Sequence, residues 1–76
     1  MPEMDYTLLV DRMKEYGYTQ LTLADRIGIV RASLNMKLNG KRAFKIWEIA
    51  RICDILDIPT EEIGRFFFTP KPQPAG

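Results

Sequence analysis

Residues 19–42 read TQLTLADRIGIVRASLNMKLNGKR, and this stretch decides the fold. Its first half predicts a short helix that begins after Thr19, because threonine is a preferred N-cap residue. Gly28 then permits the positive φ that a sharp turn requires. A second short helix is expected over about residues 31–38, and a small basic loop follows it. Two short amphipathic helices joined at a glycine are the layout of a helix-turn-helix motif.

The rest of the chain predicts three further helices. Asp5 is a good N-cap for a helix over about residues 6–16, where apolar residues recur at helical spacing. A fourth helix is expected over about residues 45–56, and Thr60 should cap a short fifth helix. The expected inner face of the fourth helix consists of Ile46, Ile49, Ala50, Cys53 and Leu56.

These elements predict a compact all-α domain of five helices over residues 1–68. Prolines at alternate positions make residues 69–76 an extended, flexible tail. With 76 residues the chain forms one small domain, whose core is modest.

Composition argues against several classes of function. The chain has one cysteine and no histidine, so neither an internal disulfide nor a metal or catalytic cluster is expected. The sequence has no nucleophile-and-base spacing and no glycine-rich phosphate loop, so neither an enzyme nor a bound cofactor is expected. No apolar run approaches membrane-spanning length and no secretion signal is visible, so a cytoplasmic protein is expected.

The charge of the chain is unevenly distributed. The formal net charge is only +1, but residues 31–51 contain six basic side chains against one acidic one. The segments on either side are net acidic. The positive charge therefore lies on the second helix of the motif and just after it, where a phosphate-facing surface would need it, although an ordinary solvated face fits the same distribution.

The spacing of these features resembles the Cro/cI-type (XRE) helix-turn-helix family of phage repressors and related bacterial regulators. The similarity covers about residues 6–66 and includes Thr19-Gln20, Ala24, Gly28 and Asn39-Gly40-Lys41. Small single-domain phage regulators often carry three further pieces that are present here, namely KLNGK at 37–41, WEIA at 47–50 and FFTPK at 67–71. The resemblance implies a lambda-repressor-like fold.

The same resemblance assigns the contacts with double-stranded DNA. Leu34 and Leu38 are expected to face inward, which turns Arg31, Ala32, Asn35 and Met36 outward at the base-reading positions of the family. Arginine can bond guanine, asparagine can bond adenine, and apolar side chains can contact a thymine methyl. The residues expected to contact phosphates are Gln20, Ser33, Asn39, Lys41 and Arg42.

Two positions depart from the family. Val30 lies where a serine or threonine usually caps the second helix of the motif, and valine cannot accept the first-turn N–H bonds. Met13 and Leu38 stand where well-known phage repressors carry a buried ion pair, and the two apolar residues are expected to pack together instead.

Two functions remain open from the sequence. The first is a sequence-specific phage or prophage regulator, repressor or Cro-like, that binds an operator as a homodimer, with Phe66, Phe67 and Phe68 as dimer contacts. The second is a protein-interaction module on the same fold, either an anti-repressor-like modulator or a toxin-neutralising partner. The first is the main interpretation, and the near-neutral net charge keeps the second open.

Overall fold

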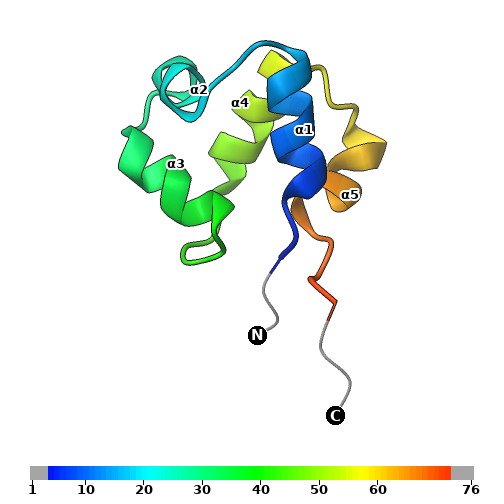
Figure 1. Ribbon diagram of the computed structural model, residues 1–76. Helices are drawn as coiled ribbons and strands as arrows, with labels where there is room; N and C mark the ends of the chain where they lie inside the picture. The colour runs from blue at the N-terminus through cyan, green and yellow to red at the C-terminus, as the bar shows by residue number, and fades with distance from the viewer. Residues whose placement is uncertain (1–3, 73–76) are drawn as a thin grey trace.

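The computed structural model describes residues 4–72. In these residues the elements are α1 (Thr7–Glu15), α2 (Gln20–Ile27), α3 (Arg31–Leu38), α4 (Ile46–Leu56), a 3₁₀ turn η1 (Thr60–Glu62) and α5 (Ile63–Phe67). Figure 1 shows α2 and α3 together on one side of α4, and α1 with α5 on the other. The expected all-α, five-helix fold is confirmed.

Local sequence signals set the bounds of the helix-turn-helix. The Thr19 hydroxyl accepts a hydrogen bond from the backbone N–H of Thr22 at 3.2 Å, and the Thr22 hydroxyl accepts one from the N–H of Thr19 at 2.9 Å. This reciprocal pair satisfies two N–H groups that the helix leaves free. At the other end of α2, Gly28 has a φ of 97°, and its N–H bonds to the carbonyl of Ala24 at 2.8 Å. Val30 makes no side-chain cap for α3.

The core lies where the five helices meet. Leu9 of α1, Leu23 of α2, Leu34 of α3 and Leu56 of α4 are fully buried, and Phe67 of α5 closes the cluster. Each helix of the motif therefore buries one apolar face and leaves the other on the surface. That arrangement fixes which side of α3 is available to a partner.

The orientation of α4 differs from the sequence prediction. Ile46 and Ala50 were expected to face the core, but both are exposed, and Ile46 keeps 86% of its surface. Leu56 is buried as predicted, and Ile49 and Cys53 pack against the core, but the other fully buried positions are Glu48 and Ile52. Because α4 is apolar around much of its circumference, periodicity does not single out one face.

The two ends of the described chain pair with each other, so Thr69 and Pro70 of the predicted tail contact the domain, and the boundary at residue 68 stays a prediction. The N–H of Asp5 bonds to the carbonyl of Thr69 at 2.6 Å, and Met4 forms an isolated antiparallel bridge with Pro70. A residue before proline prefers an extended backbone, which suits Thr69 for this pairing. Residues 73–76 of the predicted tail lie outside the described residues.

Gly28 should be hard to replace. No atom lies within 4 Å of a Cβ built there, so the cost of Gly28→Ala is the strain of a φ of 97° alone. We expect a loss of about 1–2 kcal/mol in the free energy of unfolding, measured by urea denaturation. Gly64 is the matched control, because it lies inside α5 with similar open space. Gly64→Ala should stabilise by about 0.5–1 kcal/mol, and a loss at both positions would contradict the strain argument.

Candidate recognition surface

The outward face of α3 carries the residues that were predicted to read bases. Arg31, Ala32 and Asn35 are exposed, whereas Met36 is half-buried. The Asn35 amide is held from both sides: it donates to the Gln20 side chain at 3.0 Å and accepts from the Asn39 side chain at 3.1 Å. The structure therefore brings together Gln20, Asn35 and Asn39 in one polar network across α2, α3 and the following loop.

The basic loop lies at the end of α3. Lys41 and Arg42 are exposed, and the N–H of Lys41 bonds to the carbonyl of Met36 at 2.9 Å, which holds the loop against the helix. Ser33, the remaining predicted phosphate contact, is half-buried on α3. The predicted anchor residues thus border the α3 face.

A buried ion pair joins α3 to α4, and sequence reasoning missed it. The Lys37 ammonium bonds to the Glu48 carboxylate, and their side chains are 5% and 1% exposed. The second carboxylate oxygen accepts the backbone N–H of Lys45 at 2.7 Å, at the start of α4. Lys37 was counted among the surface charges, but the pairing removes its charge from the α3 surface. The signal in the sequence was Glu48, the single acid within a basic segment.

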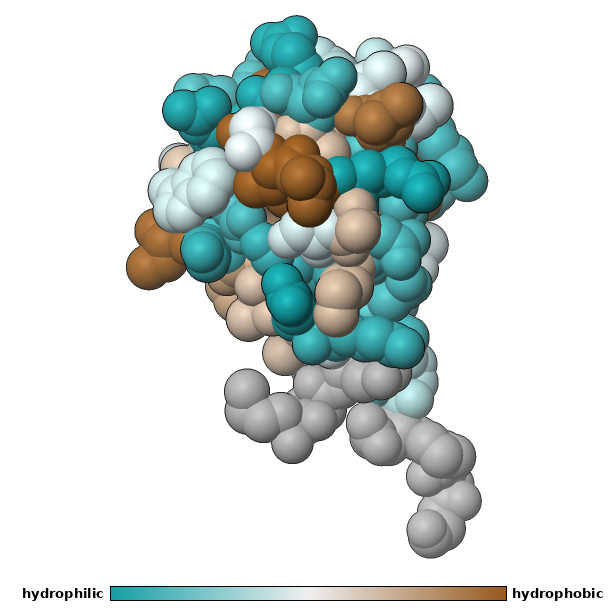
Figure 2. All heavy atoms as spheres, turned by 90° about the vertical axis from the view of Figure 1, so that its left-hand side faces the viewer, coloured by the Kyte–Doolittle hydropathy of each residue, from teal (hydrophilic) through white to brown (hydrophobic). Residues whose placement is uncertain are grey.

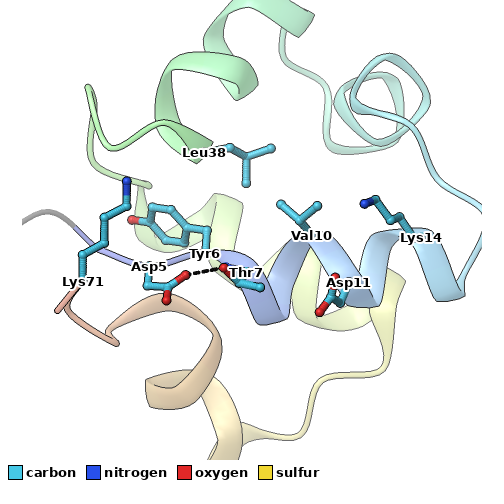
Figure 3. A pocket seen from close by; sticks show the side chains of 8 residues that line it. All are labelled: Asp5, Tyr6, Thr7, Val10, Asp11, Lys14, Leu38 and Lys71. Carbon is cyan, nitrogen blue, oxygen red and sulfur yellow. Dashed lines mark hydrogen bonds between the residues drawn. The ribbon is translucent and has the colours of Figure 1, made fainter.

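Leu38 was expected in the core, at a position where well-known phage repressors carry one partner of a buried ion pair. It is half-buried and packs at the edge of the core. Figure 3 shows Leu38 facing a hollow of about 310 Å³ that Val10 of α1 and Tyr6 also line. At the rim, hydrogen bonds from the Thr7 hydroxyl and backbone N–H, together with the charge of Lys71, lower the pKa of Asp5. The Met13–Leu38 contact remains a prediction.

Arg51, in the middle of α4, links this helix to the end of α2. Its guanidinium donates to the carbonyl of Ile27 at 3.1 Å and lies 5.9 Å from the centre of the Trp47 ring. The carbonyl is at the end of α2, just before Gly28. One side chain therefore connects Trp47 with the α2–α3 turn.

The three phenylalanines have separate environments. Phe66 and Phe67 are buried in the core, so their prediction as dimer contacts is corrected: their surfaces are already covered within one chain. Phe68 is 58% exposed and could still meet another molecule. Three consecutive residues on a helix cannot all face one side.

Cys53 has no feature of a reactive thiol. It is half-buried, and burial raises its pKa, with the nearby Asp54 adding to the shift. Within residues 4–72, no group of histidine, cysteine and acidic side chains could hold a metal ion. No helix in the same part of the chain is long and apolar enough to cross a membrane.

Apolar side chains interrupt the polar surface around the motif. Figure 2 faces α2 and α3 and shows hydrophobic patches among the hydrophilic side chains. The exposed large apolar residues of α2, the α2–α3 turn and the start of α4 are Leu21, Val30, Ile46 and Trp47. This surface combines apolar and basic groups.

Comparison with known proteins gives one family and one informative structure. A search of curated proteins found no match. The solution structure of the modulator of repression (MOR) of the temperate bacteriophage TP901-1 from Lactococcus lactis is similar, with a TM-score of 0.74 and 29% identity over 87% of this chain and 89% of that chain. A family described as "Protein of unknown function (DUF739)" matches residues 3–70. Because that match spans nearly the whole sequence, the chain belongs to the DUF739 family.

Proposed function

We propose that this chain is a non-enzymatic phage or prophage regulator that modulates repression by binding a repressor protein. The observation that carries the proposal is the similarity to a modulator of repression over 87% of this chain and 89% of the other. With so little of either chain left outside the match, the role of that protein has to be supplied by this small fold. The anti-repressor-like alternative is therefore preferred to a stand-alone repressor.

The surface charge supports the same preference. Of the basic side chains in residues 31–51, Lys37 is buried in an ion pair and Arg51 is bonded to the Ile27 carbonyl. The exposed cations in that segment are Arg31, Lys41, Arg42, Lys45 and Arg51, and Arg51 keeps its charge although it bonds to a backbone carbonyl. One chain offers these five exposed cations in the segment, fewer than the roughly 6–10 phosphate contacts of a strongly salt-dependent DNA binder, so operator binding would depend on a second copy.

The exposed apolar residues add to this argument. A helix that reads DNA needs few large hydrophobic groups, because most of its contacts go to phosphates and polar base edges. Val30 and Ile46 are 70% and 86% exposed beside the motif. Protein interfaces, in contrast, bury apolar groups at their centre.

Operator binding as a homodimer in the cytoplasm is the second candidate. It is favoured by the exposure of Arg31 and Asn35 on α3, together with Lys41 and Arg42 in the loop that follows. These residue types suit the major groove and the phosphate backbone.

One experiment separates the two candidates. The purified chain is titrated with the purified repressor of the same phage or prophage in a calorimeter, and separately taken through a binding selection on random duplex DNA. We expect a saturable complex with the repressor and no enriched DNA motif. Enrichment of a single palindrome without repressor binding would replace this proposal by the operator-binding candidate.

A further inference from the structure

The start of α4 and the α2–α3 turn share an exposed apolar surface that the fold does not use. We name it the turn patch, and it consists of Val30, Ile46 and Trp47 together with the side chain of Arg51. Ile46 is 86% exposed and Val30 is 70% exposed, while Trp47 keeps 45% of its surface. Single exposed apolar residues are ordinary on a protein surface, but here Ile46 and Trp47 are adjacent in the chain, and Val30 lies three residues after Ile27, whose carbonyl binds Arg51 of the same helix as Trp47.

Arg51 shows that these residues belong to one surface. Its guanidinium lies 5.9 Å from the centre of the Trp47 ring and 3.1 Å from the Ile27 carbonyl, so it reaches from α4 to the end of α2, next to the turn that carries Val30. Ile46 precedes Trp47 directly. The bond to the carbonyl and the contact with the ring hold Arg51 in place before any partner arrives, which lowers the entropy lost on binding.

The rim of the turn patch is basic. Arg31 follows Val30, Lys45 precedes Ile46, and both are exposed. Glu48, which follows Trp47, is buried in its pair with Lys37 and adds no negative charge to the surface, and the exposed acid beside Arg51 is Asp54, which lines a hollow together with Arg51 and the further cation Arg26. A partner that fits this surface presents apolar side chains flanked by carboxylates.

A second copy of the chain fits less well. Two turn patches facing each other would place Arg31, Lys45 and Arg51 of both copies close together, and like charges facing each other across an interface disfavour association. The apolar centre also differs from what a phosphate backbone offers. The charge pattern therefore selects a different protein as the occupant.

We infer that the turn patch is the surface by which this chain binds an apolar, acid-flanked segment of the repressor. The inference rests on the proposed function and adds the binding surface and the chemistry of the partner's segment. Trp47 and Arg51 are residue types that dominate binding energy at protein interfaces. The Asn35 network and the loop cations are not required for this contact.

The test uses substitutions at Ile46, because this side chain has almost no packing within the chain. Ile46→Asp places a charge at the centre of the patch and should weaken binding of the repressor by about 30-fold or more, the size seen at hot spots. Ile46→Lys loses the same apolar contact, but its positive charge matches the surrounding cations and can attract the carboxylates of the partner. It should therefore weaken binding less than Ile46→Asp. Calorimetry with the purified repressor gives both dissociation constants.

Leu8→Asp is the matched control. Leu8 is an exposed apolar residue in the first turn of α1, as Ile46 is in the first turn of α4. A carboxylate is tolerated at both positions because it lies near the positive end of a helix. Leu8→Asp should bind the repressor as the wild type does, and thermal melts of all three variants should stay close to the wild type.

Each other outcome has a distinct meaning. If Ile46→Asp binds the repressor as tightly as the wild type, this inference is wrong and the proposed function stands. If the wild type does not bind the repressor, the proposed function itself fails.

Two outcomes would assign the patch to another occupant. A wild-type dimer in sedimentation that Ile46→Asp dissociates would assign the patch to a second copy. Loss of binding to random duplex DNA in Ile46→Asp would assign it to DNA. Weaker binding by Ile46→Lys than by Ile46→Asp would overturn the acid-flanked partner.

Discussion

Lys37→Met should lower the free energy of unfolding by about 3–5 kcal/mol, because it removes one partner of a buried ion pair. The Glu48 carboxylate would remain 1% exposed, with only the N–H of Lys45 to stabilise its charge. Methionine is close to lysine in length and fills the same space. The loss in the free energy of unfolding therefore comes mainly from the unpaired negative charge of Glu48. In a domain of this size the midpoint of thermal unfolding should fall by at least about 12 °C.

The matched control restores electrical balance. In the double variant Lys37→Met with Glu48→Gln, the glutamine oxygen can still accept the N–H of Lys45, and no charge is left buried. Replacing both partners of a buried pair is often nearly neutral, so the double variant should regain most of the lost stability. Urea denaturation of the four proteins in the cycle gives the coupling energy. A Lys37→Met protein as stable as the wild type would mean that the pair is not buried as described.

Phe67→Ala should also cost about 3–5 kcal/mol, the usual price of removing a buried phenylalanine ring. Phe67 is 1% exposed, and its ring meets that of Phe44 edge to face, with 5.3 Å between the ring centres. Phe44 in turn contacts Tyr6 in the same manner, again at 5.3 Å. The loss of one ring therefore loosens the junction of α5, the α3–α4 loop and the segment before α1.

Phe68→Ala is the control for that prediction. The neighbouring ring is 58% exposed, and surface substitutions generally change stability by about 0.5 kcal/mol or less. Chemical denaturation of both variants gives the comparison. Equal losses at the two positions would contradict the assignment of Phe67 to the core and of Phe68 to the surface.

Local signals in the sequence determined the helix-turn-helix. Thr19 and Gly28 fixed the two ends of α2, since capping bonds and a positive φ depend on the residue itself and its close neighbours. The predicted bounds of α3, residues 31–38, also agree with the structure, although Val30 gives this helix no side-chain cap. The outward position of Arg31 and Asn35 was predicted from the inward positions of Leu34 and Leu38; in the structure Leu34 is buried and Leu38 is half-buried.

The tertiary structure decided which side of each remaining element is buried. Periodicity could not orient α4, because apolar residues lie around much of its circumference; the packed core buries Ile52 completely and leaves Ile46 86% exposed. The choice of Lys37 over Leu38 for the interior depended on Glu48, eleven residues away. The pairing of Thr69 with Asp5 joins opposite ends of the chain. Each of these contacts joins residues that are distant in the sequence and meet only when the helices pack together. Such contacts produce no local periodicity or capping signal from which they could be predicted.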